Sequence, residues 1–344
     1  MREVLIPFLK KPAHFYDRKM MKVGHPTRRY KLYCGLKNEA LPAATLPIDW
    51  TKAGALNFPM DDNDTLGDCM VAAAEHADNT FTGNWTTESV FNDAQTKAWY
   101  LALAGGDNGL DEGTLVSGWK KGLPGITQAV ILDALDVDPT NAPMMASVIQ
   151  EFMGCVFMLS VPDAWISNWK PGYVWDAGAG IVANPQNGHG TWWPGAKLVN
   201  GQQYDHGLTW GGDYWITPAG IALCDPSAFA VLSPRMFNSQ GYAPNGRHAS
   251  QSAAIWVQAG GNSAAAAALV AMFPAIGPNP GPGPQPTPVP VPSPTPTPVP
   301  SPTGHDFDTV MAAMAKKWQG NWMAEREIGG IKAEGDKIIA AGGA

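Results

Sequence analysis

Hydrophobic and polar positions recur along the first half of this chain at helical spacing. The predicted helices cover residues 69–82, 87–104 and 113–121. The first is rich in alanine and stops at Gly83, a residue that commonly ends helices. We expect Asp68, or the nearby Asp64 and Thr65, to cap its start with a side-chain oxygen.

Beyond residue 133 the pattern changes to short apolar runs rich in β-branched and aromatic residues, which is typical of strands. The predicted strands cover residues 155–161, 196–199, 206–210, 214–217 and 229–232. A helical half followed by a sheet half predicts an α+β fold of two lobes, one helical and one an antiparallel sheet or barrel.

The chain divides into five predicted segments, which are a basic arm (1–40), a main domain (41–247), an alanine-rich helical segment (248–277), a proline-rich spacer (278–304) and a tail (305–344). Thirteen of the 25 residues 278–302 are proline, so this spacer is expected to be extended and to reach roughly 75 Å. The tail has apolar residues at helical spacing and predicts an amphipathic helix. It is too short to fold alone, so we expect it to dock the protein into a larger assembly.

Charge is distributed unevenly between the arm and the remaining chain. The net charge is −7, yet residues 1–40 carry ten Lys or Arg and three Asp or Glu, which leaves −14 for the rest. The arm can therefore lie on the acidic body of its own chain, or bind an anionic partner such as nucleic acid.

Four cysteines stand far apart, without the spacing of a zinc ribbon or a disulfide framework, and we predict no metal or other cofactor. The apolar runs near the N-terminus and at 264–273 are too short for a signal-peptide core or a membrane span. The sequence thus predicts a cytoplasmic or virion-associated protein.

The segment with the clearest chemistry runs from Asn63 to Cys69, where a cysteine follows a glycine-containing turn and opens the first predicted helix. A helix N-terminus presents free N–H groups and a partial positive charge, which favour a thiolate. A nucleophilic cysteine needs that form near neutral pH.

This segment resembles the nucleophile region of papain-like cysteine peptidases, with Asn63 six positions before Cys69 where the family has an oxyanion-stabilising amide. Downstream, the Asn-Gly-His-Gly run around His189 and the Leu-Thr-Trp-Gly run at 208–211 resemble the family's histidine strand and its Asn-Ser-Trp-Gly block. Across about residues 45–240 the chain is also similar to uncharacterised phage and bacterial proteins of the superfamily. The resemblance implies Cys69 as nucleophile and His189 as base, with His206 as a competitor for that role.

The residue that would orient the base departs from the family pattern. Leu208 stands where the family has asparagine, and its side chain accepts no hydrogen bond. Thr209 or Asp205 can take this role, or Cys69 and His189 can act as a pair alone.

The resemblance implies acyl transfer, in which the Cys69 thiolate attacks an amide and His189 protonates the leaving amine. The expected function is that of a peptidase acting on a protein or on peptidoglycan peptides. The tryptophans between residues 165 and 215 offer rings that can stack on sugars, but such residues are typical of core packing. The alternative is a catalytically silent module that serves as a structural or attachment component of a phage particle or similar assembly.

Overall fold

The computed structural model describes residues 41–51, 56, 58–63, 65–85, 88–89, 91–126 and 130–274. All of the described residues belong to one compact unit, Met1–Asn279. The basic arm, the proline-rich spacer and the tail lie outside the described residues, so the interpretations placed on them remain predictions.

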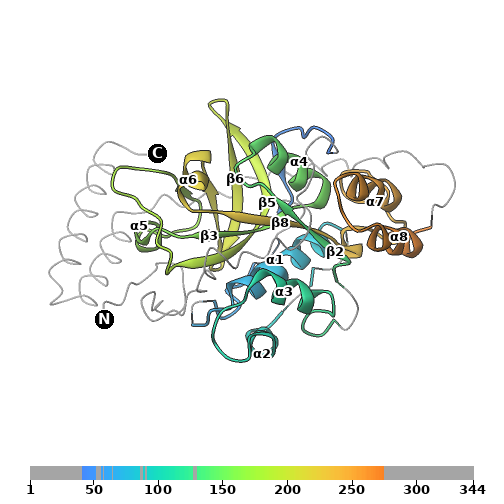
Figure 1. The fold of residues 1–344 in the computed structure, drawn as a ribbon, viewed down its shortest axis with the longest axis horizontal. Coiled ribbons are helices and arrows are strands. Elements are labelled where there is room, and N and C mark those ends of the chain that lie inside the picture. Colours follow the sequence, from blue (N-terminus) through green and yellow to red (C-terminus); the bar gives the residue numbers. More distant parts are fainter. Residues whose placement is uncertain are drawn as a thin grey trace, which may run out of the picture. The chain divides into compact units, whose positions relative to one another are not determined.

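Strands occupy much of the described second half of the chain and form one sheet (Figure 1). Their bounds are β1 Ile48–Asp49, β2 Asp133–Val137, β3 Cys155–Ser160, β4 Tyr173–Trp175, β5 Gly188–Val199, β6 Gln202–Thr209, β7 Gly212–Ile216 and β8 Ser227–Leu232. The order is β2-β8-β3-β5-β6-β7-β4, with β1 paired to β5. All the pairs are antiparallel except β4 with β7, which is parallel.

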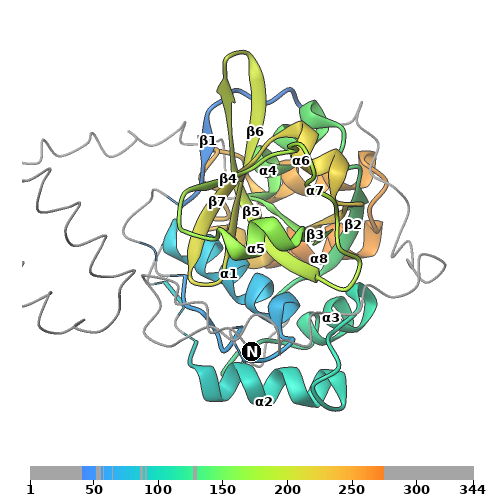
Figure 2. The same cartoon turned by 90° about the vertical axis from the view of Figure 1, so that its left-hand side faces the viewer.

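The helices of the described chain come both before and between the strands. Their bounds are α1 Cys69–Gly83, α2 Asp93–Ala104, α3 Glu112–Trp119, α4 Ala142–Phe152, α5 Asp163–Ser167, α6 Pro218–Leu223, α7 Ala249–Gln258 and α8 Ser263–Met272, with a short 3₁₀ turn at Pro234–Met236. Figures 1 and 2 both show α1 between the sheet and α2. The predicted α+β class, with a helical half and an antiparallel sheet half, is confirmed.

Most predicted elements of the main domain are present, with shifted ends. α1 and β3 lie within a residue of their predicted bounds, while β5 begins at Gly188, well before the predicted strand at 196. α4 and β2 were not predicted. Eight of the eleven residues of α4 are buried, and Asn141 caps its start by accepting from the Met144 N–H.

Helix α1 crosses the centre of the described structure, and 14 of its 15 residues are buried. The predicted cap at its start is wrong. Asp68 is the N-cap residue, but at φ −98° and ψ 14° its side chain accepts no capping hydrogen bond, whereas Thr65 Oγ1 donates to the Asp62 carbonyl instead. Asp64 lies outside the described residues.

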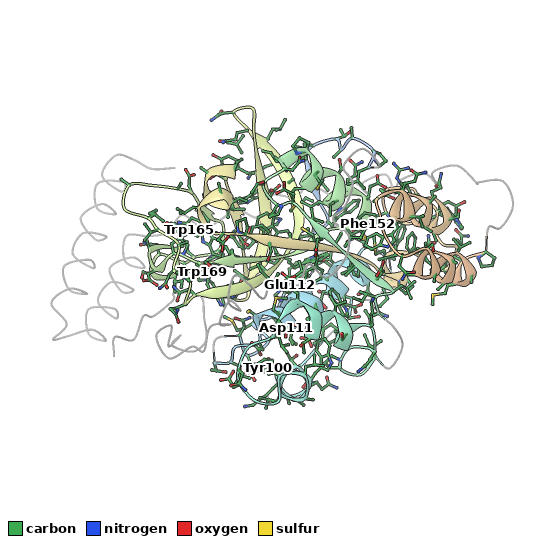
Figure 3. The ribbon with its side chains drawn as sticks, in the orientation of Figure 1. Tyr100, Asp111, Glu112, Phe152, Trp165 and Trp169 are labelled. Carbon is green, nitrogen blue, oxygen red and sulfur yellow. The ribbon has the colours of Figure 1, made fainter. Side chains whose placement is uncertain are left out.

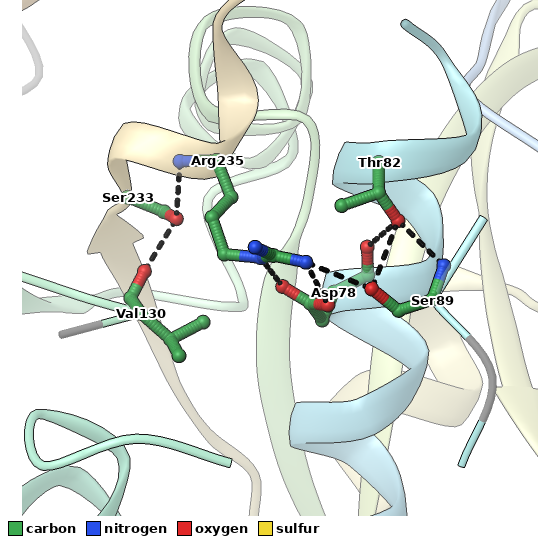
Figure 4. A network of polar contacts seen from close by, with 6 residues as sticks. All are labelled: Asp78, Thr82, Ser89, Val130, Ser233 and Arg235. Atoms are coloured by element: carbon green, nitrogen blue, oxygen red, sulfur yellow. Dashed lines mark hydrogen bonds and ion pairs between the residues drawn. The ribbon is translucent and has the colours of Figure 1, made fainter. Parts of the chain in front are cut away.

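An ion pair ties α1 to the turn after β8 (Figure 4). The Arg235 guanidinium donates through Nε to Asp78 Oδ1, and through Nη2 to Asp78 Oδ2 (2.9 Å) and Ser89 Oγ (2.8 Å). Asp78 is fully buried. Ser233 Oγ, next to the same turn, bonds the Val130 carbonyl (2.5 Å) and the Arg235 N–H (3.1 Å). The pair therefore fixes α1 against the sheet.

Tryptophans fill the core of the sheet half. Side chains at most 5% exposed are those of Trp165, Trp169, Trp175, Trp192, Trp193 and Trp210. Figure 3 shows Trp165, which is part of α5, close to Trp169. Trp175 stacks on both Trp165 and Tyr214. Rings enclosed in this way have no free face for a sugar, so these residues support core packing over carbohydrate binding.

Candidate active site

Cys69 is the first residue of α1, and β5 passes directly beside it. The Gly190 N–H donates to Cys69 Sγ at 3.3 Å, which places the residue after His189 against the sulfur. A Cβ on Gly190 would lie 2.4 Å from Met70 Sδ, so the glycine lets the strand approach the helix without displacing the Met70 side chain. The fold therefore brings together two segments that are 120 residues apart in the sequence.

His189 is held from two sides. Its Nε2 forms a short hydrogen bond with Thr209 Oγ1, and its ring stacks on the Trp210 ring with 4.4 Å between centroids. His189 and Thr209 are 1% and 3% exposed. Thr209 is therefore the side chain that bonds the His189 ring through Nε2.

Trp210 has φ of 47°, which is strained for a bulky residue in a two-residue hairpin turn between β6 and β7. Turns of this kind usually take Asn, Asp or Gly at that place. Such strain persists only where surrounding contacts hold it, and here the ring lies over His189. No role was predicted for Trp210 from the sequence, although its position in the Thr-Trp-Gly run was a usable signal.

His206, the competing base, and Leu208 both lie on β6. Successive side chains of a strand alternate between faces, so Leu208 and His206 project from the face of β6 opposite to Thr209. His206 stacks on Trp215, and its Nε2 lies 3.3 Å from Asp213 Oδ2. The structure therefore does not bring His206 to Cys69, and the departure at Leu208 has no bearing on the orientation of His189.

Asp205 is buried and bonds Gln203 Nε2 at 2.7 Å, rather than His189. Burial raises the pKa of its carboxyl to about 7. Of the two residues proposed to orient the base, the geometry among the described residues favours Thr209 over Asp205.

Asn63 follows a tight turn in which Asp61 and Asp62 both have positive φ. Its N–H donates to the Met60 carbonyl at 3.0 Å, and the residue is 5% exposed. This turn places Asn63 just ahead of α1, but the contacts do not show its amide at the sulfur, so its oxyanion role remains a proposal.

The electrostatics of Cys69 differ from the sequence prediction. Burial raises the pKa of its thiol to about 12, and the nearby Asp68 carboxyl raises it further, although the N–H groups of Gly190, Met70 and Cys69 act in the opposite direction. The expected resting thiolate is therefore wrong for this closed site, because loss of hydration outweighs the helix N-terminus. Cys69 rests as a neutral thiol, 3% exposed.

A second group of ionisable side chains lies buried around the first turns of α1. Asp68 is fully buried and no other described residue donates a hydrogen bond to its carboxyl; Glu75 is also fully buried and accepts only from Thr96 Oγ1 (2.7 Å) among the described residues. Burial raises the pKa of both carboxyls well above its usual range, and repulsion from neighbouring carboxylates, Asp61 among them, raises it further. Both groups are therefore held protonated to higher pH than in water.

This burial predicts a fold that is more stable in mild acid than at neutral pH. Folding raises the pKa of Asp68 and Glu75 above the unfolded values of 3.8 and 4.5, so their contribution is fully present below those values and is lost as the pH rises through the folded pKa. In urea unfolding, the stability gained by Asp68→Asn should be larger at pH 8 than at pH 5 by about 1 kcal/mol or more, because the cost of keeping this carboxyl protonated grows as the pH rises above its unfolded pKa. The control is Asp138→Asn, at an exposed carboxylate, which should change the stability by the same amount at pH 5 and at pH 8. An equal gain from Asp68→Asn at both pH values would contradict the assignment.

Groups of three or more His, Cys, Asp or Glu side chains able to hold a metal ion do not occur among the described residues. Within the same ranges, the helices are too short or too polar to cross a bilayer.

No protein-family description and no curated protein matches the sequence. Among solved structures, the chain is similar to xylellain, a cysteine protease from Xylella fastidiosa, with 12% identity over 58% of this chain and 91% of that one and a TM-score of 0.43. It is also similar to a structure concerning the mite allergens Blo t 1 and Der p 1, with 12% identity over 62% of this chain and 80% of that one and a TM-score of 0.44. A third similar structure is procathepsin L 3 of the Tenebrio molitor larval midgut, with 12% identity over 59% of this chain and 74% of that one and a TM-score of 0.40. Likeness at this level assigns no activity, and the similarity to phage proteins remains a prediction.

Proposed function

We propose that this protein is a cysteine hydrolase that cleaves amide bonds, with Cys69 as nucleophile, His189 as base and Thr209 as the residue that orients the base. The observation that carries the proposal is the convergence of two segments: the Gly190 N–H contacts Cys69 Sγ while the adjacent His189 is fixed by Thr209 and Trp210. A cysteine at a helix start, a buried histidine next in sequence to the residue that contacts the sulfur, and a third group on that histidine support this assignment.

The neutral thiol determines the order of the proton transfers. As Sγ bonds to the substrate carbonyl carbon, its proton passes to the His189 ring, and the carbonyl electron pair moves to oxygen, where the Cys69 N–H and the Asn63 amide are proposed to stabilise it. When the C–N bond breaks, His189 gives that proton to the leaving amine. Water then attacks the thioester, His189 takes its proton, and the thiol is regenerated with release of the acid. The proposed substrates are proteins or peptidoglycan peptides.

The test compares the alkylation of Cys69 by iodoacetamide in the intact protein and in His189→Ala, followed by mass spectrometry of the Cys69 peptide at several pH values. Because the thiol needs a base to lose its proton, labelling at pH 6.5 should fall about a hundredfold in His189→Ala. His206→Ala is the matched control and should label like the intact protein, because His206 projects from the other side of the sheet. Labelling that ignores His189 at every pH would refute the Cys69–His189 pair.

A second candidate function is a silent module that serves as a structural or attachment component. The burial of the Cys69 sulfur and its raised pKa favour this candidate, because an accessible activated thiol shows neither property. In that case the alkylation of Cys69 follows an ordinary thiol titration and does not depend on His189.

A further inference from the structure

A polar network joins the turn before Cys69 to the loop between α2 and α3. Asp107 Oδ1 accepts hydrogen bonds from the Gly67 N–H (3.0 Å) and from the Tyr100 hydroxyl (2.9 Å), and the Tyr100 hydroxyl in turn accepts from the Gly109 N–H (2.8 Å). Gly67 lies two residues before Cys69. One carboxylate oxygen thus connects three segments, and one of them leads directly into the nucleophile helix.

The residues of this network are placed firmly. Tyr100 is fully buried on α2, the helix labelled with it at the bottom of Figure 3. The loop carries glycines with positive φ at 105, 106 and 109, a conformation that lets it fold back on Tyr100. Asp107 itself is half-buried.

Side chains of the described residues give the start of α1 few hydrogen bonds. Asp68 gives it no side-chain cap, and the described residues donate no hydrogen bond to the Asp68 carboxyl. The position of Cys69 Sγ against the Gly190 N–H therefore depends on how the Gly67–Cys69 turn is held from the side of the helices. The Asp107–Gly67 bond is the contact that holds it there.

We propose that Asp107 and Tyr100 are positioning residues for Cys69: they fix the Gly67 N–H and thereby seat the sulfur beside Gly190 and His189. This rests on the proposed function in that Cys69 is the reacting group. Neither residue touches the sulfur or a substrate in this account, and the effect of both is transmitted through the backbone of the turn.

Loosening the turn has two opposite consequences for Cys69. Separation from His189 removes the base that assists reaction near neutral pH, so labelling at pH 6.5 slows. Entry of water removes the burial that raises the pKa of the thiol to about 12, so labelling at pH 9.5 accelerates. A change in the pH profile, rather than a uniform change in rate, is the expected signature.

The experiment follows iodoacetamide labelling of Cys69 in the intact protein and in Tyr100→Phe, Asp107→Ala and Asp107→Asn. Tyr100→Phe keeps the ring and removes one donor to Asp107. Asp107→Ala removes the acceptor, whereas Asp107→Asn keeps Oδ1 for both donors. We expect the first two variants to label about tenfold more slowly at pH 6.5 and about tenfold faster at pH 9.5, the scale of one hydrogen bond. Asp107→Asn should stay within about twofold of the intact protein.

Cys155 and Cys224, both fully buried, report general unfolding in the same sample. Tyr242→Phe is the matched control, because the Tyr242 hydroxyl makes no hydrogen bond with the described residues. Asp107→Ala also removes a charge that faces Asp68, together with Asp61 and Asp62, so Tyr100→Phe carries more weight.

The outcomes separate this inference from the proposed function. Acceleration at pH 9.5 that is confined to Cys69 and reversed in Asp107→Asn supports the positioning role even if the intact protein shows no His189-dependent labelling at pH 6.5. An unchanged Cys69 rate at pH 9.5 in both Tyr100→Phe and Asp107→Ala would overturn the inference. So would equal acceleration of all three cysteines, because that reports only a less stable protein.

Discussion

Cys69→Ala should lower the rate of amide hydrolysis by at least about a thousandfold, because removal of the nucleophile of a catalytic unit removes nearly all of its rate enhancement. The fold should survive the change, since Cys69 contributes one small side chain to the core around α1. Suitable substrates are fluorescein-labelled casein, fluorogenic acyl-dipeptide amides and peptidoglycan stem peptides. Thr209→Val, which keeps the shape but removes the bond to His189, should lose less, about a hundredfold.

Cys224→Ala is the control for this prediction. Cys224 is as buried as Cys69 but follows α6, where its N–H donates to the Ile221 carbonyl and its carbonyl accepts from the Ser160 N–H. It should hydrolyse the same substrates at the rate of the intact protein. Amine release from none of these substrates, or equal release by the intact protein and Cys69→Ala, would exclude Cys69 as the nucleophile and favour the silent module.

Local sequence signals predicted the bounds of the nucleophile helix well, but they did not predict whether the Asp68 side chain caps its start. The alanine-rich run ending at Gly83 contained its own start and stop, and α1 has those bounds. Whether Asp68 caps that helix depends on its backbone dihedral angles, which the turn at Gly67 decides. That turn is held by Asp107, 40 residues away, and no local pattern contains such a contact.

The orienting residue could be narrowed to Thr209 or Asp205 from the sequence, but the choice required the register of the sheet. β6 pairs with β5 through an irregularity between Trp192 and Gly195, so counting residues along either strand does not give their pairing. The pKa of the Cys69 thiol could not be predicted from the sequence for a similar reason. A helix N-terminus is visible in a sequence, whereas the burial that overrides it comes from β5 passing across Cys69.

Arg235→Ala should reduce the free energy of unfolding by about 3 kcal/mol and lower Tm by several degrees, because it leaves a buried carboxylate without its cation. Asp78 is fully buried in the middle of α1, and the two bonds from Arg235 are the donors to its carboxylate among the described residues (Figure 4). Without the guanidinium, the buried Asp78 carboxylate loses both of these donors. Urea unfolding followed by circular dichroism measures the change.

Lys120→Ala is the matched comparison, since it also removes a cation from a buried carboxylate. Lys120 Nζ lies 3.5 Å from Asp133 Oδ1 and is exposed to a similar extent as Arg235. Asp133 Oδ2, however, still accepts from Trp256 Nε1 and the Asn262 N–H, both at 2.9 Å. Lys120→Ala should therefore reduce the free energy of unfolding by about 1 kcal/mol or less. Equal losses in the two variants would contradict the argument, because they would show that the donors remaining on Asp133 do not compensate for a lost cation.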